Sequence, residues 1–145
     1  MKCKIIIDKN RDEEVFVYAH EKTKLVEEIE NLVLGNSLEL IGYKDREAVK
    51  LRPFEVCCFL VEDNRVYAIT DDDKLLIKQR LYQLEETLDD SFVKINQSCI
   101  ANINKIQRFN ASFAGALLVV FKNGYSDYVS RRKIKTVKER LGVKL

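Results

Sequence analysis

Residue types that usually carry catalysis or bind cofactors are scarce in this chain of 145 residues. It has a single histidine, His20, one proline, five glycines and no tryptophan. General acid–base catalysis most often uses histidine, and none of the glycines stands in a phosphate-binding loop pattern. Ser98 and Cys99 have no candidate base nearby in the sequence. We therefore expect a protein that is not an enzyme and that needs no cofactor.

Metal ligands and disulfide frameworks are also missing. The four cysteines are Cys3, Cys57, Cys58 and Cys99, and no two of them have CxxC spacing. Adjacent cysteines in a strand point to opposite faces, so we expect small apolar fillers and not a zinc site. The run of three aspartates at 71–73 could hold a hard cation, but a solvated hairpin tip is the preferred interpretation.

Long apolar segments are absent as well, since no stretch approaches the roughly 18 residues of a membrane-spanning helix. The first residues, MKCKIIIDKNRDEE, contain only a brief apolar run before the charges begin, so we expect no signal peptide and a cytoplasmic location. With 46% hydrophobic and 33% charged residues, the composition is typical of a soluble globular protein of one domain with, at most, a short appendage.

Charge is divided unevenly along the chain, although the net charge is only +2. Residues 92–145 carry eleven Lys or Arg against two acidic residues, a net charge of +9. Residues 1–91 carry fourteen basic and twenty-one acidic residues, a net charge of −7. Such asymmetry indicates one surface for a polyanion and another surface for a different partner.

Apolar periodicity predicts three helices. The segment TKLVEEIENLVLG at 23–35 has an apolar stripe and ends on a glycine, and RLYQLEETL at 80–88 predicts a short internal helix. A C-terminal helix is predicted over 131–141, with Ser130 as its N-cap and Gly142 as its stop.

The rest of the chain reads as short strands. CKIIID and EEVFVYAH, joined by the turn KNRD, predict two strands before the first helix. YKDRE and EDNRV are expected hairpin turns, and Asn123-Gly124 is the clearest turn of the chain. We therefore expect a mainly β fold, α+β overall.

The basic segment combines two kinds of side chain that bind DNA. Its amides and hydroxyls can read base edges, and its cations neutralise phosphates. The polar residues are Asn96, Gln97, Ser98, Asn102 and Asn104; the cations are Arg131, Arg132, Lys133 and Lys135. Three cations at a helix N-terminus are unfavourable unless an anion is present, and DNA would supply it. Ordinary turn chemistry for the amides and a solvated face for the cations remain the alternatives.

These segments resemble the LytTR-type DNA-binding domain of bacterial transcription regulators. The resemblance lies in FVKINQSCIANINKI followed by LLVVFKNGYSDYVSRRKIKTVKERL, and it extends over residues 37–145. It implies an elongated antiparallel β fold with a short internal helix and a C-terminal helix. Residues 1–36 would then form a small β-β-α cap, too short for a receiver domain.

The resemblance also implies a mode of binding, in which loops reach successive major grooves of double-stranded DNA. Three contact regions follow from it: Asn64 with Arg65, then Asn96 to Ser98, then Arg131 with Arg132. Some members of the family have histidine where Asn64 stands, which leaves the recognised base sequence open. The family further implies a homodimer, or two copies on direct repeats, and pairing with a regulatory membrane protein.

A protein-interaction module is the alternative from another class. Its basic C-terminal face would bind an acidic partner or an anionic membrane surface in place of DNA. A DNA-binding protein should show an affinity for DNA that depends steeply on salt and is higher for one sequence than for others, which would distinguish it from the interaction module.

Overall fold

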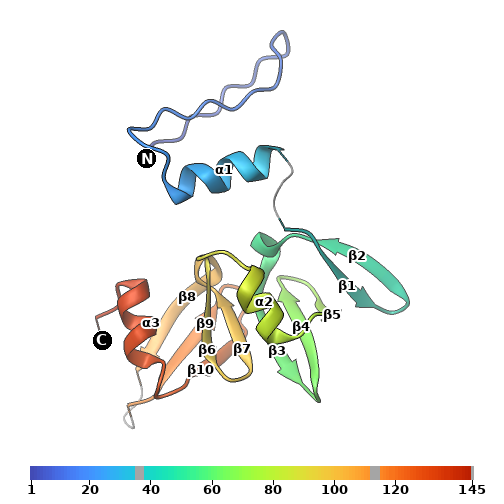
Figure 1. The fold of residues 1–145 in the computed structure, drawn as a ribbon, viewed down its shortest axis with the longest axis vertical. Helices are drawn as coiled ribbons and strands as arrows, with labels where there is room; N and C mark the ends of the chain where they lie inside the picture. The colour runs from blue at the N-terminus through green and yellow to red at the C-terminus, as the bar shows by residue number, and fades with distance from the viewer. Residues whose placement is uncertain (35–37, 112–114, 145) are drawn as a thin grey trace. The chain divides into compact units, whose positions relative to one another are not determined.

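The computed structural model of the chain describes residues 1–34, 38–111 and 115–144 (Figure 1). The chain divides into two compact units, residues 1–37 and residues 38–145. We call them the N-terminal unit and the C-terminal unit.

The described residues of the N-terminal unit contain one helix, α1 (Lys24–Leu34), where the apolar stripe predicts it. Thr23 caps its first turn. The carbonyl of Thr23 accepts a hydrogen bond from the N–H of Glu27 at 3.0 Å, and its hydroxyl accepts one from the N–H of Val26 at 3.4 Å. Side-chain oxygens at this position satisfy N–H groups that have no partner inside a helix. The helix of the predicted cap is therefore confirmed.

The two strands predicted before α1 are not formed. Residues 1–23 contain no strand in the structure; the chain instead follows two extended arms joined by a turn at Lys9 and Asn10 (Figure 1). Asp8 closes this turn by accepting the N–H of Asn10 at 3.0 Å. A two-stranded hairpin is marginally stable in water, and every side chain of residues 1–20 is exposed. No packing holds the two arms at strand spacing.

The C-terminal unit is built on two sheets whose paired strands are all antiparallel. The larger sheet has the strand order β2-β1-β5-β4-β3-β7-β6 and the smaller has the order β10-β9-β8. The larger sheet consists of β1 (Leu40–Lys44), β2 (Glu47–Leu51), β3 (Val56–Glu62), β4 (Arg65–Thr70), β5 (Lys74–Ile77), β6 (Phe92–Asn96) and β7 (Cys99–Asn102). The smaller consists of β8 (Ile106–Ala111), β9 (Leu117–Phe121) and β10 (Ser126–Val129). The predicted mainly β fold is confirmed.

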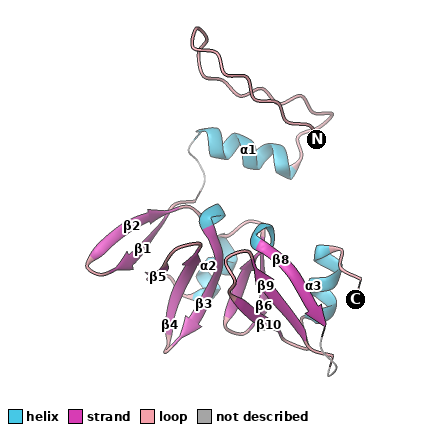
Figure 2. Cartoon of the chain, turned by 180° about the vertical axis from the view of Figure 1, so that it is seen from behind, coloured by secondary structure: helices cyan, strands magenta, loops and turns pink. Residues whose placement is uncertain are grey.

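Two helices complete the described part of this unit: α2 (Leu81–Thr87), between β5 and β6, and α3 (Ile134–Leu141), after β10. Short 3-10 turns precede β3 at Pro53–Glu55 and β8 at Ile103–Lys105. Figure 2 shows the strands in magenta, with α3 beside the smaller sheet.

The hairpin turns form where the sequence predicts them. Asp45 and Arg46 join β1 to β2, and Asp63 and Asn64 join β3 to β4; all four have positive φ, between 49° and 67°. Two-residue turns with positive φ at both positions match the twist of the flanking strands, and Asn and Asp tolerate that conformation well. Asn64 therefore lies at the tip of a tight, well-defined turn.

Strands β3, β6 and β7 send alternate side chains into two separate cores. Phe59 and Phe92, whose ring centroids are 5.8 Å apart, belong to the core that includes Leu84 of α2. Cys58 and Ile95 belong to the core formed with the smaller sheet and α3. Side chains alternate between the faces of a strand, so the larger sheet has one core on each face. The middle of this sheet is thereby held rigidly from both sides.

Candidate nucleic-acid interface

The β3–β4 turn and the β6–β7 turn lie at the same end of the larger sheet. Strand β3 pairs with β7, and just beyond the ladder the N–H of Val61 donates to the carbonyl of Ser98 at 2.8 Å. The turn at Asp63 and Asn64 follows β3, while Asn96 to Ser98 form the turn before β7. Two of the three expected contact regions are therefore neighbours.

The third region adjoins the second. The side-chain amide of Asn96 donates to the carbonyl of Tyr128 at 2.7 Å, and the N–H of Ser130 donates to the carbonyl of Ile95 at 2.9 Å. These bonds attach the end of β10, and the segment that leads into α3, to the β6–β7 turn. We call Glu62–Arg65, Asn96–Ser98 and Ser130–Lys135 together the three-segment edge.

The start of α3 differs from the prediction. The helix begins at Ile134 with Lys133 as its N-cap, and the N–H of Lys133 donates to the carbonyl of Ser130 at 2.8 Å. Ser130 is not the N-cap, because β6 holds its backbone and a turn over 130–133 intervenes. Arg131 and Arg132 thus precede the helix. The predicted stop at Gly142 is confirmed by its left-handed conformation, with φ 67°.

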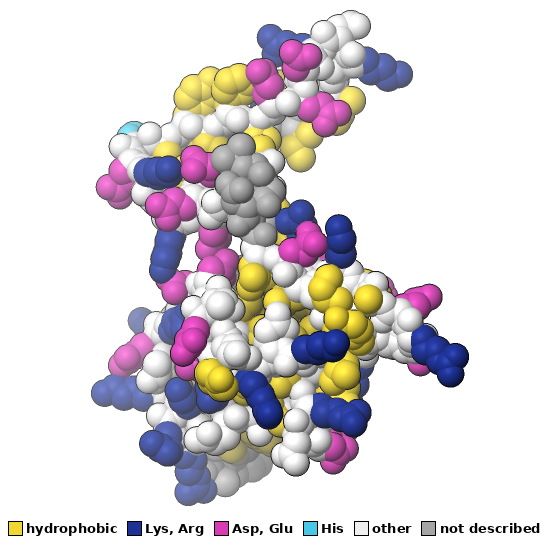
Figure 3. All heavy atoms as spheres, turned by 45° about the vertical axis from the view of Figure 1, so that its right-hand side comes forward, with side chains coloured by type: hydrophobic (Ala, Val, Ile, Leu, Met, Phe, Trp, Pro, Cys, Tyr) yellow, Lys and Arg dark blue, Asp and Glu magenta, His cyan; other side chains and the backbone are white. Residues whose placement is uncertain are grey.

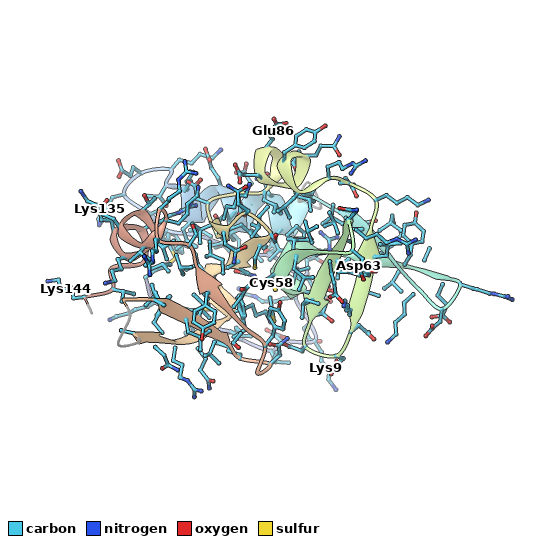
Figure 4. All side chains as sticks on the ribbon, turned by 90° about the horizontal axis from the view of Figure 1, so that it is seen from below. Lys9, Cys58, Asp63, Glu86, Lys135 and Lys144 are labelled. Carbon is cyan, nitrogen blue, oxygen red and sulfur yellow. The ribbon has the colours of Figure 1, made fainter. Side chains whose placement is uncertain are left out.

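The three-segment edge is rich in cations. Among the described residues, the cations of the three-segment edge form no ion pair with an acidic side chain; they are Arg65, Arg131, Arg132, Lys133 and Lys135. All but the half-buried Lys133 are exposed. Figure 3 shows Lys and Arg side chains in dark blue projecting from the surface, and Figure 4 shows Lys135 at the outside of α3.

Three other cations of the C-terminal half are compensated inside the fold. Lys94 lies 4.0 Å from Glu85, Lys105 lies 3.7 Å from Asp71, and Arg140 donates to the carbonyl of Asp90 at 2.8 Å. At the edge itself, the Nζ of Lys74 lies 2.6 Å from a carboxylate oxygen of Glu62, and this ion pair compensates the negative charge of Glu62. This hydrogen bond raises the pKa of Lys74. Five cations without an ion pair among the described residues thus lie together where the three segments meet.

The predicted polar residues do not all have free side chains. Gln97 and Ser98 are exposed at the edge, as is Asn64. Asn96, by contrast, uses both polar atoms of its side chain within the protein. Its Nδ2 donates to Tyr128, and its Oδ1 accepts the N–H of Ser98 at 2.8 Å. Its amide therefore shapes the turn that presents Gln97.

Asn102 and Asn104, named with the amides of the basic segment, are remote from this edge. Asn102 is 2% exposed; its amide donates to the carbonyl of Val56 at 2.8 Å, and its Oδ1 accepts the N–H of Asn104 at 3.0 Å. Both residues lie at the opposite end of β7 from Ser98. Asn102 is a structural amide and cannot reach a base.

Three of the four thiols fill space in the core, as the sequence predicts, but Cys3 is exposed, so the prediction is wrong for that residue. Cys57, Cys58 and Cys99 are buried, and Figure 4 shows Cys58 in the interior. Burial, followed by the nearby Asp71 carboxylate, raises the pKa of Cys57 to about 11. A hydrogen bond with Cys58, together with burial, raises the pKa of Cys99. Protonated thiols are poor nucleophiles and poor metal ligands. The described residues contain no cluster of side chains suited to a metal ion.

We expect only Cys3 to react rapidly with a thiol reagent in the native protein. Cys3 is exposed, whereas the other three thiols are buried and out of reach of the reagent. A Cys3→Ser variant should show almost no fast reaction with a disulfide reagent at pH 8, and three thiols should react after denaturation. Fast reaction of any thiol in the native variant would contradict this burial.

None of the helices in the described part of the chain is long and apolar enough to cross a membrane.

Comparison with known proteins agrees with this architecture. The family model for the LytTr DNA-binding domain matches residues 46–142. An uncharacterized HTH-type transcriptional regulator of Staphylococcus aureus strain NCTC 8325 is 34% identical over 146 residues, which cover 99% of each chain. A similarly named protein of strain MW2 is 33% identical over the same coverage. A solved LytTr DNA-binding domain from Bacillus cereus superimposes with a TM-score of 0.68 at 21% identity, covering 72% of this chain and 97% of that one.

Proposed function

Because this chain belongs to the family of LytTr DNA-binding domains, we propose that it regulates transcription by binding one particular sequence of double-stranded DNA with its three-segment edge. The family and its relatives make it a DNA-binding regulator. The finer proposal concerns which side chains read the bases and how many copies bind.

The observation that carries the proposal is the union of three separate loops at one end of the sheet. Hydrogen bonds of 2.7 to 2.9 Å join them through Ser98, Asn96 and Ser130. Loops held in fixed register by a rigid sheet can enter a groove without the ordering cost that a flexible arm would incur. The uncompensated cations on the same edge provide the attraction to phosphate.

Each segment has a proposed role at DNA. Arg131 and Arg132 bind phosphate and a guanine edge, since the guanidinium fork matches guanine in the major groove. Gln97 and Ser98 read a second position, and Asn64 with Arg65 reads a third in a successive major groove. Lys133 and Lys135 contact the backbone. Asn96 acts through the protein, as a positioning residue that holds the β6–β7 turn against β10.

We further propose that two copies bind adjacent direct repeats and that a membrane protein regulates the chain. Both features follow from membership of the family. Two linked copies would gain affinity because binding of the first raises the effective concentration of the second.

Selection of bound duplexes from a random pool is the experiment that tests the function. We expect one enriched sequence, bound at least about 10³-fold more tightly than random duplex at physiological salt. A log–log salt slope consistent with several phosphate contacts should accompany it. An unenriched pool with no salt dependence would contradict the proposal and favour the alternative, an acidic protein partner or an anionic membrane surface.

Lys135→Ala should weaken binding to every duplex alike. Lys135 is exposed on the first turn of α3 and has no ion pair among the described residues, so its expected role is to neutralise one phosphate. The slope of log affinity against log salt should then fall by about 1 in magnitude, with sequence preference unchanged. Fluorescence anisotropy at a series of salt concentrations measures this slope.

Lys122→Ala is the matched control for this change. Lys122 is also exposed, but it lies in the turn between β9 and β10, at the far end from Ser98, where its N–H donates to the carbonyl of Lys105 at 2.9 Å. If the salt slope fell equally in both variants, the contacts with phosphate would not be confined to the three-segment edge.

A further inference from the structure

The N-terminal unit exposes an unusual amount of apolar surface. None of residues 1–33 is buried, although this segment is rich in large hydrophobic side chains. Those exposed by more than a third are Met1, Ile5, Ile6, Ile7, Val15, Phe16, Val17, Tyr18, Leu25, Leu32 and Val33. Figure 3 shows yellow side chains on the surface of this unit. Apolar patches of this kind on a soluble protein usually mark an interaction site.

This unit is too small to be stable by itself. Domains below about 40 residues usually need disulfides, metals or oligomerisation, and this one has 37 residues and a single cysteine. Helix α1 has eleven residues, fewer than the roughly 12–15 at which isolated helices become even marginal in water. Its two extended arms lack the third strand or packed layer that a hairpin requires.

The apolar residues occupy more faces than one helix can cover. Side chains of a fully extended chain alternate, which would place Ile6 on the face of the first arm opposite to Ile5 and Ile7. The same alternation would place Phe16 opposite to Val15 and Val17. A segment that is apolar on both faces is typical of a layer covered from both sides. Helix α1 could cover one side, which leaves the other for a partner.

Charge favours a second copy of the same unit as that partner. The first arm begins with Lys2 and Lys4, whereas the second arm begins with Glu13 and Glu14; no ion pair involves any of these four in the described part of the chain. The basic arm of one copy could therefore lie against the acidic arm of the other. The unit carries six basic and eight acidic residues, so an anionic membrane would not attract it.

We propose that the N-terminal units of two copies pack against each other through these apolar arms and α1, and that this contact forms a homodimer. Eleven large apolar side chains per copy would supply the dry centre of the interface, with the charged arms at its rim. The dimer itself does not depend on the proposed function. Only its biological role does, which is to bring two DNA-binding units together.

Sedimentation equilibrium of the full chain without DNA tests the pairing. We expect a particle of twice the 16.9 kDa chain mass at micromolar concentration. Phe16→Ser, which removes an aromatic ring that is 70% exposed, should raise the dimer dissociation constant by about tenfold or more. Phe54→Ser is the matched control, since Phe54 is 56% exposed in the C-terminal unit. It should leave the dimer intact.

A second readout separates loss of pairing from loss of folding. The C-terminal unit of Phe16→Ser should keep its thermal transition and its affinity for a single half-site, because that unit has its own two cores. A monomeric wild-type chain, an undiminished Phe16→Ser dimer, or dissociation caused by Phe54→Ser would each overturn the inference. A stable dimer that binds no DNA would instead uphold it and reject the proposed function.

Discussion

Arg132→Ala should lower affinity for the selected DNA sequence by about 1–3 kcal/mol, which is about 5- to 150-fold, while leaving the fold intact. Arg132 is exposed and has no ion pair among the described residues, so its removal takes away no internal contact. The loss should be much smaller for random duplex, since a guanine contact distinguishes one sequence from another. Competition binding with selected and random duplexes measures both.

Arg46→Ala is the control for this change. Arg46 is likewise an exposed arginine in a turn, but it joins β1 to β2 at the end where Lys44 contacts Asp73 at 2.8 Å, opposite to the three-segment edge. We expect it to bind DNA almost as the unchanged protein does. Normal specific binding by Arg132→Ala, or equal losses in both variants, would refute the role of Arg132 in base reading.

Asn102→Ala should destabilise the C-terminal unit by about 1–3 kcal/mol, because it leaves one buried and one partly buried backbone group without their partners. These are the carbonyl of Val56 and the N–H of Asn104, which the side chain of Asn102 now satisfies at 2.8 and 3.0 Å. Guanidinium unfolding should show a lower midpoint with an unchanged slope.

Asn110→Ala provides the comparison, since Asn110 is an exposed amide on β8. Surface changes of this kind usually alter stability by less than about 0.5 kcal/mol. If the two variants were equally stable, Asn102 would not be the structural amide that its hydrogen bonds indicate. Without denaturant, where the variant is still folded, Asn102→Ala should bind DNA, because Asn102 lies at the end of β7 that is far from the three-segment edge.

The curated relatives are named HTH-type, yet the described residues form no helix-turn-helix. Helices α2 and α3 are separated by all the strands from β6 to β10. The candidate surface consists of turns joined by backbone and amide hydrogen bonds, with a helix only at its margin. In this chain a sheet therefore holds the loops in the way that a recognition helix holds its side chains in other DNA-binding folds.

Local patterns were enough to predict much of the fold. The apolar stripes located three helices, and Asp-Asn and Asn-Gly pairs located turns, because these signals depend on neighbours a few residues apart. The prediction of two strands in residues 1–20 was wrong, because strands also depend on contacts with distant parts of the chain. The pattern of these residues is typical of strands, but strands must pair and pack to be stable, and every side chain of residues 1–20 is exposed.

For the candidate site too, the sequence predicted part of the outcome and the tertiary structure decided the rest. The sequence by itself determined that cations and amides are concentrated after residue 91, and that Asn64 stands at the tip of a tight turn. Only the tertiary structure decided which of them are free. Asn96 and Asn102 are bound to backbone groups 32 and 46 residues away, and Lys94 and Arg140 are compensated by the acidic segment before β6. Such partners are brought together by the pairing and packing of strands, which no local pattern encodes.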